Sequence, residues 1–383
     1  MKIGVVGGGQ LGRMLGLAGI PLGFQFRFFE PSSDCPAAAL GEIIRAPYDD
    51  PDGLERFARD LSCATYEFEN VPAETAHWLD ERLSLAPSPK ALAVAQDRIV
   101  EKAAFRDLGI PVQATASITS AADIVTAVRA VALPAVLKTR RLGYDGKGQR
   151  VLRASSAVAC NADAVALVQS AWDELGRVPC ILESFVTFTA EVSQIAVRSR
   201  RRAHAADIAF YPLTQNEHRS GILFKSSSPA PCDPTGELAA QAQAYVARLM
   251  ESLDYVGVIA VEFFVTTGGL IANEMAPRVH NSGHWTIDGS VTSQFENHLR
   301  AVAGLSLGST ASRGASVMIN LVGRAPIVAR LLEVPHAHVH LYGKGARAGR
   351  KLGHVTLIAP MAQDLVDPAA QIELLAAWNL PSH

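Results

Sequence analysis

The sequence is poor in the features that mark secreted, metal-ribbon or membrane proteins. Its 383 residues include only five cysteines, which are scattered and form no Cys-x-x-Cys pair: Cys35, Cys63, Cys160, Cys180 and Cys232. This pattern argues against a zinc ribbon and a disulfide framework, and it predicts a reduced, cytoplasmic chain. No apolar run approaches the roughly 18 residues of a membrane span, and glycines and Arg13 interrupt the apolar N-terminus. We therefore expect no transmembrane helix and no signal peptide.

The chain also lacks an excess of charge of either sign. Its 35 basic and 37 acidic residues leave a formal net charge of −2, so no basic surface points to nucleic acid or to anionic lipid. There is no internal repeat and no low-complexity block. The hydrophobic content of 49% is enough for two or three domains with cores of their own.

The first thirty residues predict an anion-binding turn. An apolar strand at 1–6 leads into the glycine turn 7–12, and an apolar helix follows at 13–17. Backbone N–H groups in such a turn approach phosphates or other anions. The next strand, 26–29, ends in Glu30, near the position of the ribose-binding acid of nicotinamide enzymes. A dehydrogenase is thus one hypothesis, and an enzyme that uses the turn for another anion is the alternative.

Alternation of strands and helices continues to residue 68 and predicts a doubly wound parallel sheet, which we expect to end near 83–89. Ligands of such sheets bind at the carboxyl ends of the strands, where Glu67, Glu69 and Asn70 lie. These side chains are candidates for binding an amine or ribose hydroxyls. A capped helix start before Pro72 explains each of them equally well.

A helix is predicted from Gln96 to Leu108. Its charged residues Asp97, Arg98, Glu101 and Lys102 share one helical face, which we expect to be solvated.

The next polar feature follows the apolar strand 133–137, which ends in Lys138. The loop 143–149, Gly-Tyr-Asp-Gly-Lys-Gly-Gln, is rich in glycine but does not match the Walker A motif. A lysine at a strand end before a glycine loop suggests a triphosphate site. An ordinary hairpin turn is the alternative.

Two glutamates interrupt consecutive apolar strands. Glu262 lies in 258–265 and Glu274 follows 269–272, so an antiparallel hairpin through 266–269 would bring them together. Two carboxylates about 4 Å apart repel by roughly 4 kcal/mol at an effective dielectric of 20. A magnesium ion with phosphate oxygens as further ligands would remove that cost. The alternative is a pair of edge-strand glutamates that face water.

The segment 273–284, Asn-Glu-Met-Ala-Pro-Arg-Val-His-Asn-Ser-Gly-His, carries an unusual density of functional groups behind a hydrophobic strand and predicts a site. An amphipathic helix at 236–253 is expected to pack on the sheet that carries the two glutamates. Near the C-terminus Lys344, Arg350 and Lys351 are candidates for binding a phosphomonoester, and an exposed basic turn is the alternative.

Taken together, these motifs resemble the N5-carboxyaminoimidazole ribonucleotide synthetase family of ATP-grasp enzymes. The resemblance spans nearly the whole chain, and the block 273–286 is its most specific part. It rests on residues 7–14, 96–98, 143–149, 210–214, 273–286, 293–296 and 349–354.

The resemblance implies an α/β and α+β ATP-grasp fold with three parts. These are an N-terminal Rossmann-like domain (1–95), a two-lobed ATP-grasp domain (96–305, small lobe about 112–186) and a small β-rich C-terminal domain (306–383). It also implies ATP and magnesium as cofactors, 5-aminoimidazole ribonucleotide and bicarbonate as substrates, and a homodimer.

The resemblance assigns roles to individual residues. Magnesium falls to Glu262 and Glu274, and catalysis to Tyr144, Asp145, Arg278, His280 and Lys344. The ATP site comprises Arg98, Lys138, Gly143, Tyr144, Asp145, Gly146, Lys147, Gly148, Gln149, Glu183, Ser184, Phe185, Val186, Glu191, His218, Asn273 and Glu274. The substrate site comprises Gln10, Leu11, Glu69, Asn70, Arg278, His280, Lys344, Arg350 and Lys351.

Within these sets, residues 183–186 would form the adenine hinge, Glu191 would contact the ribose, and Asp145 would steer the exocyclic amine. Another ATP-grasp ligase, such as the formate-dependent glycinamide ribonucleotide transformylase, is the nearest alternative. The nicotinamide dehydrogenase rests on the first thirty residues alone. A non-catalytic adenylate sensor would not need the metal carboxylates.

Overall fold

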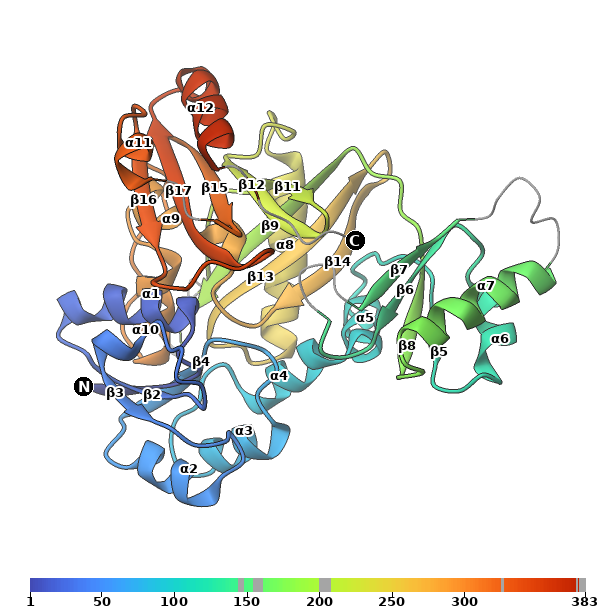
Figure 1. Ribbon diagram of the computed structural model, residues 1–383, viewed down its shortest axis with the longest axis horizontal. Helices are drawn as coiled ribbons and strands as arrows, with labels where there is room; N and C mark the ends of the chain where they lie inside the picture. The colour runs from blue at the N-terminus through green and yellow to red at the C-terminus, as the bar shows by residue number, and fades with distance from the viewer. Residues whose placement is uncertain (144–147, 154–160, 200–207, 325–326, 377, 379–383) are drawn as a thin grey trace.

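The structure, a computed structural model, describes residues 1–143, 148–153, 161–199, 208–324, 327–376 and 378. It contains three sheets of four, nine and four strands. In Figure 1 the N-terminal sheet lies at the lower left, the small four-stranded sheet on the right, and the large sheet between them and above. In the described part of the chain no helix is long and apolar enough to cross a membrane.

The N-terminal sheet is parallel, as the sequence predicts, with the strand order β3-β2-β1-β4. Its strands are apolar and mostly buried because helices cover them. Asp50 caps one of these helices, since its carboxylate accepts a hydrogen bond from Gly53 N at 2.8 Å. The elements are β1 Lys2–Val6, α1 Gln10–Gly19, η1 Ile20–Leu22, β2 Gln25–Phe29, η2 Ala38–Leu40, β3 Glu42–Ile44, α2 Pro51–Ala58, β4 Cys63–Tyr66 and α3 Ala73–Asp80.

The helix predicted from Gln96 to Leu108 is α5, Arg98–Asp107, and a further helix, α4 Pro89–Gln96, precedes it. Asp97 separates them and caps α5, because its carboxylate accepts a hydrogen bond from Ile99 N at 3.1 Å. The expectation of a solvated charged face on this helix is wrong. Asp97, Glu101 and Lys102 are 4%, 2% and 0% exposed, because β14 and the small sheet cover them.

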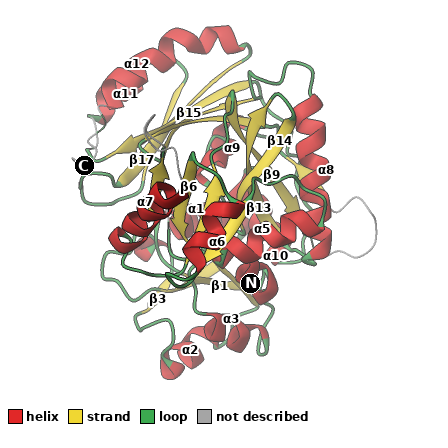
Figure 2. Ribbon diagram, turned by 90° about the vertical axis from the view of Figure 1, so that its right-hand side faces the viewer, coloured by secondary structure: helices red, strands yellow, loops and turns green. Residues whose placement is uncertain are grey.

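The small sheet is antiparallel, with the order β5-β8-β6-β7. Helices α6 and α7 pack on it through a core that includes Leu137, Val168 and Leu182, and both lie near the viewer in Figure 2. The elements are β5 Thr115–Ile118, α6 Asp123–Ala130, β6 Ala135–Thr139, β7 Gln149–Leu152, α7 Asn161–Glu174 and β8 Cys180–Ser184.

The large sheet has the order β14-β13-β9-β11-β12-β15-β17-β16, with β10 paired to β9. Helix α8 packs on it through Val246, Leu249 and Met250, against Ile259 and Phe263, which confirms the predicted contact. Residues 200–207, between β9 and β10, lie outside the described residues. The elements up to residue 302 are β9 Ala190–Arg198, β10 Ile208–Phe210, β11 Thr214–Arg219, β12 Ile222–Ser228, α8 Glu237–Ser252, β13 Gly257–Thr266, β14 Gly269–Ala276, η3 Asn281–Gly283, α9 Thr286–Gly289 and α10 Gln294–Val302.

The C-terminal strands extend this same sheet, since β15 pairs with β12 on one side and with β17 on the other. A division at residue 306 therefore separates chain segments whose strands share one hydrogen-bonded ladder. The remaining elements are β15 Ala315–Val322, α11 Val328–Leu332, β16 Ala337–Leu341, β17 Lys351–Ala359, η4 Ala362–Leu365 and α12 Val366–Ala376.

His298 of α10 joins the N-terminal sheet to the large sheet. Its Nδ1 accepts a hydrogen bond from Val258 N at 3.0 Å, and its Nε2 lies 2.8 Å from Thr65 Oγ1. The ring is fully buried, and burial lowers the pKa of His298 to about 4. A neutral imidazole with its proton on Nε2 satisfies both partners.

We predict that His298→Leu lowers the free energy of unfolding by about 2 kcal/mol at neutral pH, because a buried N–H and a buried hydroxyl lose their partner. The difference in unfolding free energy between wild type and variant should narrow as pH falls from about 6.5 to about 4. In this range His298 binds a proton in the unfolded wild-type protein but not in the folded one, which destabilises the wild type alone. Urea unfolding across this range measures both effects. His77→Leu, on the exposed surface of α3, is the matched control. A loss that does not depend on pH would contradict this account.

Candidate active site

A cavity of about 1080 Å³ lies where the edges of the three sheets meet. It is lined by the β1–α1 turn, the segment after β4, the start of α5, the end of β14 and the basic C-terminal loop. A second cavity, of about 640 Å³, lies along residues 109–115 and has one charged residue in its lining, Arg106. The density of charged and polar groups places the candidate active site in the larger cavity.

The glycine turn at one wall of the cavity is occupied by the chain's own carboxylates. Glu67 accepts hydrogen bonds from Gly9 N and Gly12 N, while Glu30 accepts one from Gly8 N at 2.9 Å. Burial raises the pKa of Glu67, and the two amide donors partly offset that effect. Because Glu30 also accepts a hydrogen bond from Tyr48 at 3.2 Å, it is engaged where a dehydrogenase would need a free ribose ligand. These contacts remove the basis of the dehydrogenase hypothesis.

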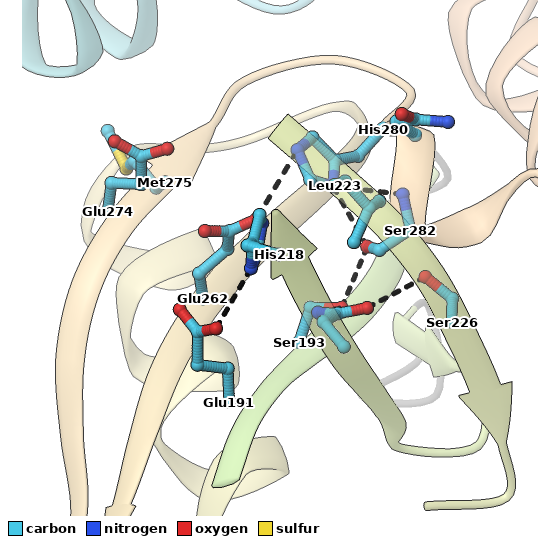
Figure 3. A network of polar contacts seen from close by, with 12 residues as sticks. Glu191, Ser193, His218, Leu223, Ser226, Glu262, Glu274, Met275, His280 and Ser282 are labelled. Carbon is cyan, nitrogen blue, oxygen red and sulfur yellow. Dashed lines mark hydrogen bonds and ion pairs between the residues drawn. The ribbon is translucent and has the colours of Figure 1, made fainter. Parts of the chain in front are cut away.

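Glu262 and Glu274 face each other across the antiparallel pair β13–β14, in the register that the sequence predicts (Figure 3). Arg98 of α5 donates to Glu274 at 2.8 Å. Burial opposes ionisation of Glu274, but Arg98 outweighs it and lowers the pKa of Glu274 to about 2. Burial and the charge of Glu274 together raise the pKa of Glu262 to about 7. One carboxylate is thus compensated and its neighbour is not.

This donor set fits magnesium. Hard oxygen ligands from two adjacent carboxylates suit the ion, and a bound divalent cation would supply the compensation that Glu262 lacks. Within the described residues, no group of three or more His, Cys, Asp and Glu side chains is arranged to hold a metal. The remaining ligands would therefore be water and phosphate oxygens, as is common for magnesium.

A chain of buried charges connects the small sheet to β14. Lys138 at the end of β6 lies 2.7 Å from Glu183 of β8, and Lys102 of α5 lies 3.7 Å from the same carboxylate. Lys102 also donates to Ala272 O at 3.1 Å and to Asn273 O. Burial opposes ionisation of Glu183, but Lys138 and then Lys102 outweigh it and lower the pKa of Glu183 to about 2.

Helix α5 thus holds β14 from several side chains at once. Besides the contacts of Arg98 and Lys102, Glu101 accepts a hydrogen bond from Met275 N at 2.6 Å. Asp97, before the helix, pairs with Arg140 through two contacts of 3.0 and 2.7 Å. The charged face of this helix therefore connects the small sheet, through Glu183 and Arg140, with the β14 segment that carries Glu274.

Arg278 and His280 follow β14 and line the cavity. Glu69 accepts a charge-assisted hydrogen bond from Arg278 Nε, and Arg278 Nη1 donates to Val279 O at 3.0 Å. His280 Nε2 lies 3.6 Å from Glu262 Oε1. Burial, and then the charges of Arg278 and Lys351, lower the pKa of His280 to about 3, so its imidazole is neutral.

His218 of β11 pairs with Glu191 of β9 through a 2.9 Å contact between Nδ1 and Oε2. Burial opposes the charged imidazole, but the hydrogen bond to Glu191 outweighs it and raises the pKa of His218. Both side chains lie beside Glu262 in Figure 3. The two residues predicted to contact the nucleotide are therefore already in contact with each other.

The basic C-terminal loop closes the opposite wall of the cavity. Lys344 donates to Gln10 Oε1, which ties this loop to the glycine turn, and Arg350 pairs with Asp34. Burial, and then Arg350, lower the pKa of Lys344. Lys351 begins β17 and lines the same cavity.

Several predicted residues have other surroundings. Tyr144, Asp145, Gly146 and Lys147 lie outside the described residues. Glu183 is 1% exposed and bound to Lys138, so any adenine contact in this segment falls to residues 184–186. Phe185 N already donates to Pro134 O at 2.9 Å. Gly143, Leu11 and Asn70 line the cavity, whereas Gln149 starts β7, where it pairs with Lys138.

Sequence reasoning missed Lys102 and the hydrogen-bonding role of Glu67. A helical charge cluster looks the same in sequence whether water or another strand covers it. A buried glutamate after a strand also looks like an external ligand. Only the contacts of β14 with α5, and of Glu67 with Gly9 and Gly12, separate these cases.

We predict that Lys102→Met lowers the free energy of unfolding by about 3 kcal/mol, since it removes the buried cation of two β14 carbonyls and leaves Glu183 with Lys138 alone. ATP binding should also weaken, because Lys138 and Asn273 lose their alignment. Urea unfolding and calorimetric ATP titration measure these effects. Lys90→Met on the neighbouring helix α4 removes an exposed lysine and is the control. Equal effects of the two substitutions would refute the role assigned to Lys102.

We further predict that magnesium affinity in the presence of ADP weakens as pH falls through about 7, approaching tenfold per pH unit, because the proton on Glu262 competes with the ion. Glu262→Gln should weaken binding and abolish this pH dependence. Calorimetric magnesium titrations between about pH 6 and pH 8 provide the test. Glu217→Gln, a half-exposed carboxylate on β11, is the control. A wild-type affinity independent of pH would contradict the role given to Glu262.

Comparisons with known proteins cover all parts of the chain. Residues 1–96 match the ribonucleotide synthetase preATP-grasp domain, residues 103–295 the ATP-grasp domain, and residues 316–367 the phosphoribosylaminoimidazole carboxylase C-terminal domain. The fold class inferred from the sequence is thereby confirmed.

Full-length relatives share one name. The chain is 53% identical over 375 residues to N5-carboxyaminoimidazole ribonucleotide synthase of Pseudomonas aeruginosa, covering 98% of this chain and 99% of that protein. It is 44% identical to the Brucella melitensis protein of the same name, covering 94% of this chain and 96% of that protein.

Solved structures agree. The N5-carboxyaminoimidazole ribonucleotide synthetase of Thermus thermophilus superposes with a TM-score of 0.90 at 49% identity, over 100% of both chains. The Aspergillus clavatus N5-carboxyaminoimidazole synthase, solved with ADP and 5-aminoimidazole ribonucleotide, gives a TM-score of 0.85 at 26% identity, covering 97% of this chain and 98% of that one. The chain therefore belongs to the N5-carboxyaminoimidazole ribonucleotide synthase family of ATP-grasp enzymes.

Proposed function

We propose that this chain is an ATP-dependent ligase of purine biosynthesis that carboxylates 5-aminoimidazole ribonucleotide with bicarbonate. ATP phosphorylates bicarbonate to carboxyphosphate, the exocyclic amine attacks it, and the products are ADP, phosphate and N5-carboxyaminoimidazole ribonucleotide. One observation carries the proposal. Glu274, which pairs with Glu262 across β13–β14, lines the same cavity as Arg98, Arg278, His280 and the glycine turn. His280 Nε2 lies 3.6 Å from Glu262 Oε1.

The carboxylate pair and the nearby cations serve phosphoryl transfer. Glu262 and Glu274 would hold magnesium, whose charge would offset the negative charge that develops on the γ-phosphoryl group. Arg98 and Lys138 orient the phosphates, and their partners Glu274 and Glu183 hold both cations in place before ATP arrives. The loop 143–149 is proposed to close over the phosphates, keeping water from the reactive intermediate.

The adenosine part of ATP is assigned to the opposite end of the site. Residues 184–186 contact the adenine through their backbone, since Glu183 is committed to Lys138. Glu191 accepts hydrogen bonds from ribose hydroxyls, with His218 as its partner, and Asn273 contacts the nucleotide next to Lys138.

Arg278 and His280 bind bicarbonate and then the carboxylate that develops from it. A guanidinium presents paired donors to a planar oxyanion, and Glu69 fixes its orientation. His280 contributes a neutral imidazole close to Glu262.

5-Aminoimidazole ribonucleotide is placed between the glycine turn and the basic C-terminal loop. Gln10, Leu11, Glu69 and Asn70 form one wall, and Lys344 with Arg350 or Lys351 binds the phosphate. Bidentate contact favours an arginine for the phosphomonoester. Tyr144 and Asp145 complete the assignment, with Asp145 steering the exocyclic amine.

The same proposal includes a homodimer and a cytoplasmic location. It also includes a division into residues 1–95, 96–305 (small lobe about 112–186) and 306–383, whose last part extends the large sheet. The formate-dependent glycinamide ribonucleotide transformylase reaction shares the nucleotide site. Among the residues that the structure describes, no contact favours formate over bicarbonate.

The proposal predicts that 5-aminoimidazole ribonucleotide strongly stimulates ADP release from magnesium-ATP and bicarbonate. Glu274→Gln should lower the stimulated rate at least about a hundredfold, because it removes one of the two carboxylates that would hold magnesium next to the transferring phosphoryl group. The exposed substitution Glu217→Gln is the control. Stimulation by formate with glycinamide ribonucleotide instead would keep the fold and replace the substrate. No response to either pair would overturn the proposal.

A further inference from the structure

A row of buried polar side chains crosses three neighbouring strands of the large sheet and ends at His280. Ser226 of β12 lies opposite Asn216 of β11, and Ser193 lies on β9, the next strand. Ser282 of η3 covers this row and connects it to the His280 ring (Figure 3). The four relay residues are at most 4% exposed, so water does not compete for their hydrogen bonds. We call Ser226, Asn216, Ser193 and Ser282 the Asn216 relay.

The contacts along the Asn216 relay are continuous and short. Ser226 Oγ donates to Asn216 Oδ1 at 2.8 Å, and Asn216 Nδ2 donates to Ser193 Oγ at 3.0 Å. Ser193 Oγ donates to Ser282 Oγ at 2.7 Å, and Ser282 Oγ lies 2.8 Å from His280 Nδ1. All these distances lie in the range of good hydrogen bonds.

Two groups determine the donor-to-acceptor direction of the hydrogen bonds in the Asn216 relay. Ser282 N donates to His280 Nδ1 at 3.3 Å, and a backbone N–H cannot accept, so Nδ1 must present a lone pair. The Asn216 side chain indicates the same direction. Because its NH₂ group donates to Ser193 Oγ, the Ser193 hydroxyl can donate to Ser282 Oγ, and the Ser282 hydroxyl can donate to His280 Nδ1. The reverse direction would place a proton on Nδ1, and that proton would then point at the N–H of Ser282.

The His280 backbone is held as firmly as its ring. Gln294 Oε1 accepts from His280 N at 3.0 Å, and Gln294 Nε2 donates to His280 O at 2.7 Å. Gln294 is fully buried, and so is Ser282. Buried protein groups, and not water, therefore fix the position of the ring and determine that Nδ1 accepts hydrogen bonds.

We propose that the Asn216 relay holds His280 as the neutral tautomer that carries its proton on Nε2. The ring then presents an N–H donor, not a lone pair, to the cavity beside Glu262 Oε1, which lies 3.6 Å away. Which ring nitrogen of a histidine carries the proton is set by the hydrogen bond that the other nitrogen makes.

This assignment gives His280 a defined part in the reaction, a consequence that rests on the proposed function. His280 donates a hydrogen bond to an oxygen of bicarbonate or of the carboxyphosphate formed from it, and it does not remove a proton from bicarbonate or from the amine. Ser193, Asn216, Ser226 and Ser282 are positioning residues, because they act on the reaction only through His280.

The tautomer can be read directly in the protein without ligands. Histidine labelled with nitrogen-15, with the His280→Gln variant to assign the signals, distinguishes a protonated from an unprotonated ring nitrogen by chemical shift. We expect Nδ1 of His280 to be unprotonated and Nε2 to be protonated. A proton on Nδ1 in the wild-type protein would overturn the proposal.

The positioning role is tested by Ser282→Ala, which removes the hydroxyl donor and leaves only the longer backbone contact at Nδ1. We expect the two nitrogen shifts to move towards each other as both tautomers become populated. The kcat should fall about tenfold, with the KM for ATP little changed, as for other losses of an outer hydrogen-bonding partner.

Ser228→Ala is the matched control, because Ser228 lies on β12, is 1% exposed, and donates to Leu213 O outside the relay. It should leave the His280 shifts and the kcat unchanged. Wild-type shifts and kcat in Ser282→Ala, or an equal loss in both variants, would overturn the positioning role. If the shifts behave as expected but 5-aminoimidazole ribonucleotide is not carboxylated, the proposed function fails while the tautomer assignment stands.

Discussion

The site depends on the buried charges of α5. Arg98 binds Glu274, while Lys102 reaches Glu183 and the backbone of β14 in a region closed to water. A buried charge of this kind is costly to leave unpaired, so each of these side chains must lie next to its partner in the folded protein. The result is that the small sheet, which carries Lys138, and the large sheet, which carries the carboxylate pair, meet at one defined position. The residues proposed for the ATP phosphates and those proposed for magnesium thereby lie next to each other.

In the glycine turn, carboxylates of the chain itself accept the backbone hydrogen bonds that a bound phosphate accepts in dinucleotide-binding proteins. Glu67 takes two amides of the glycine turn, and Glu30 takes a third. Next to these hydrogen bonds, Gln10 accepts a hydrogen bond from Lys344 of the C-terminal loop. The same glycine pattern that binds pyrophosphate in a dinucleotide fold here joins the N-terminal sheet to the far end of the chain.

The two halves of the carboxylate pair have different electrostatic surroundings. Arg98 keeps Glu274 ionised, whereas burial and the charge of Glu274 raise the pKa of Glu262 to about 7. On its other side Glu262 meets a neutral His280. A divalent cation bound by this pair would meet one ionised carboxylate and would favour ionisation of the second.

The sequence by itself determined the parallel N-terminal sheet, the β13–β14 hairpin with its paired glutamates, and the family to which the chain belongs. These follow from periodicity, from turn residues and from motifs that are local in the chain. Only the tertiary structure decided that Asp97, Glu101 and Lys102 are buried, that Glu183 is bound to Lys138, and that Ser193, Asn216 and Ser282 meet at His280. The physical reason is that burial and hydrogen-bond direction depend on what covers a side chain. That covering comes from segments far away in the sequence, as β14 covers α5 across about 170 residues.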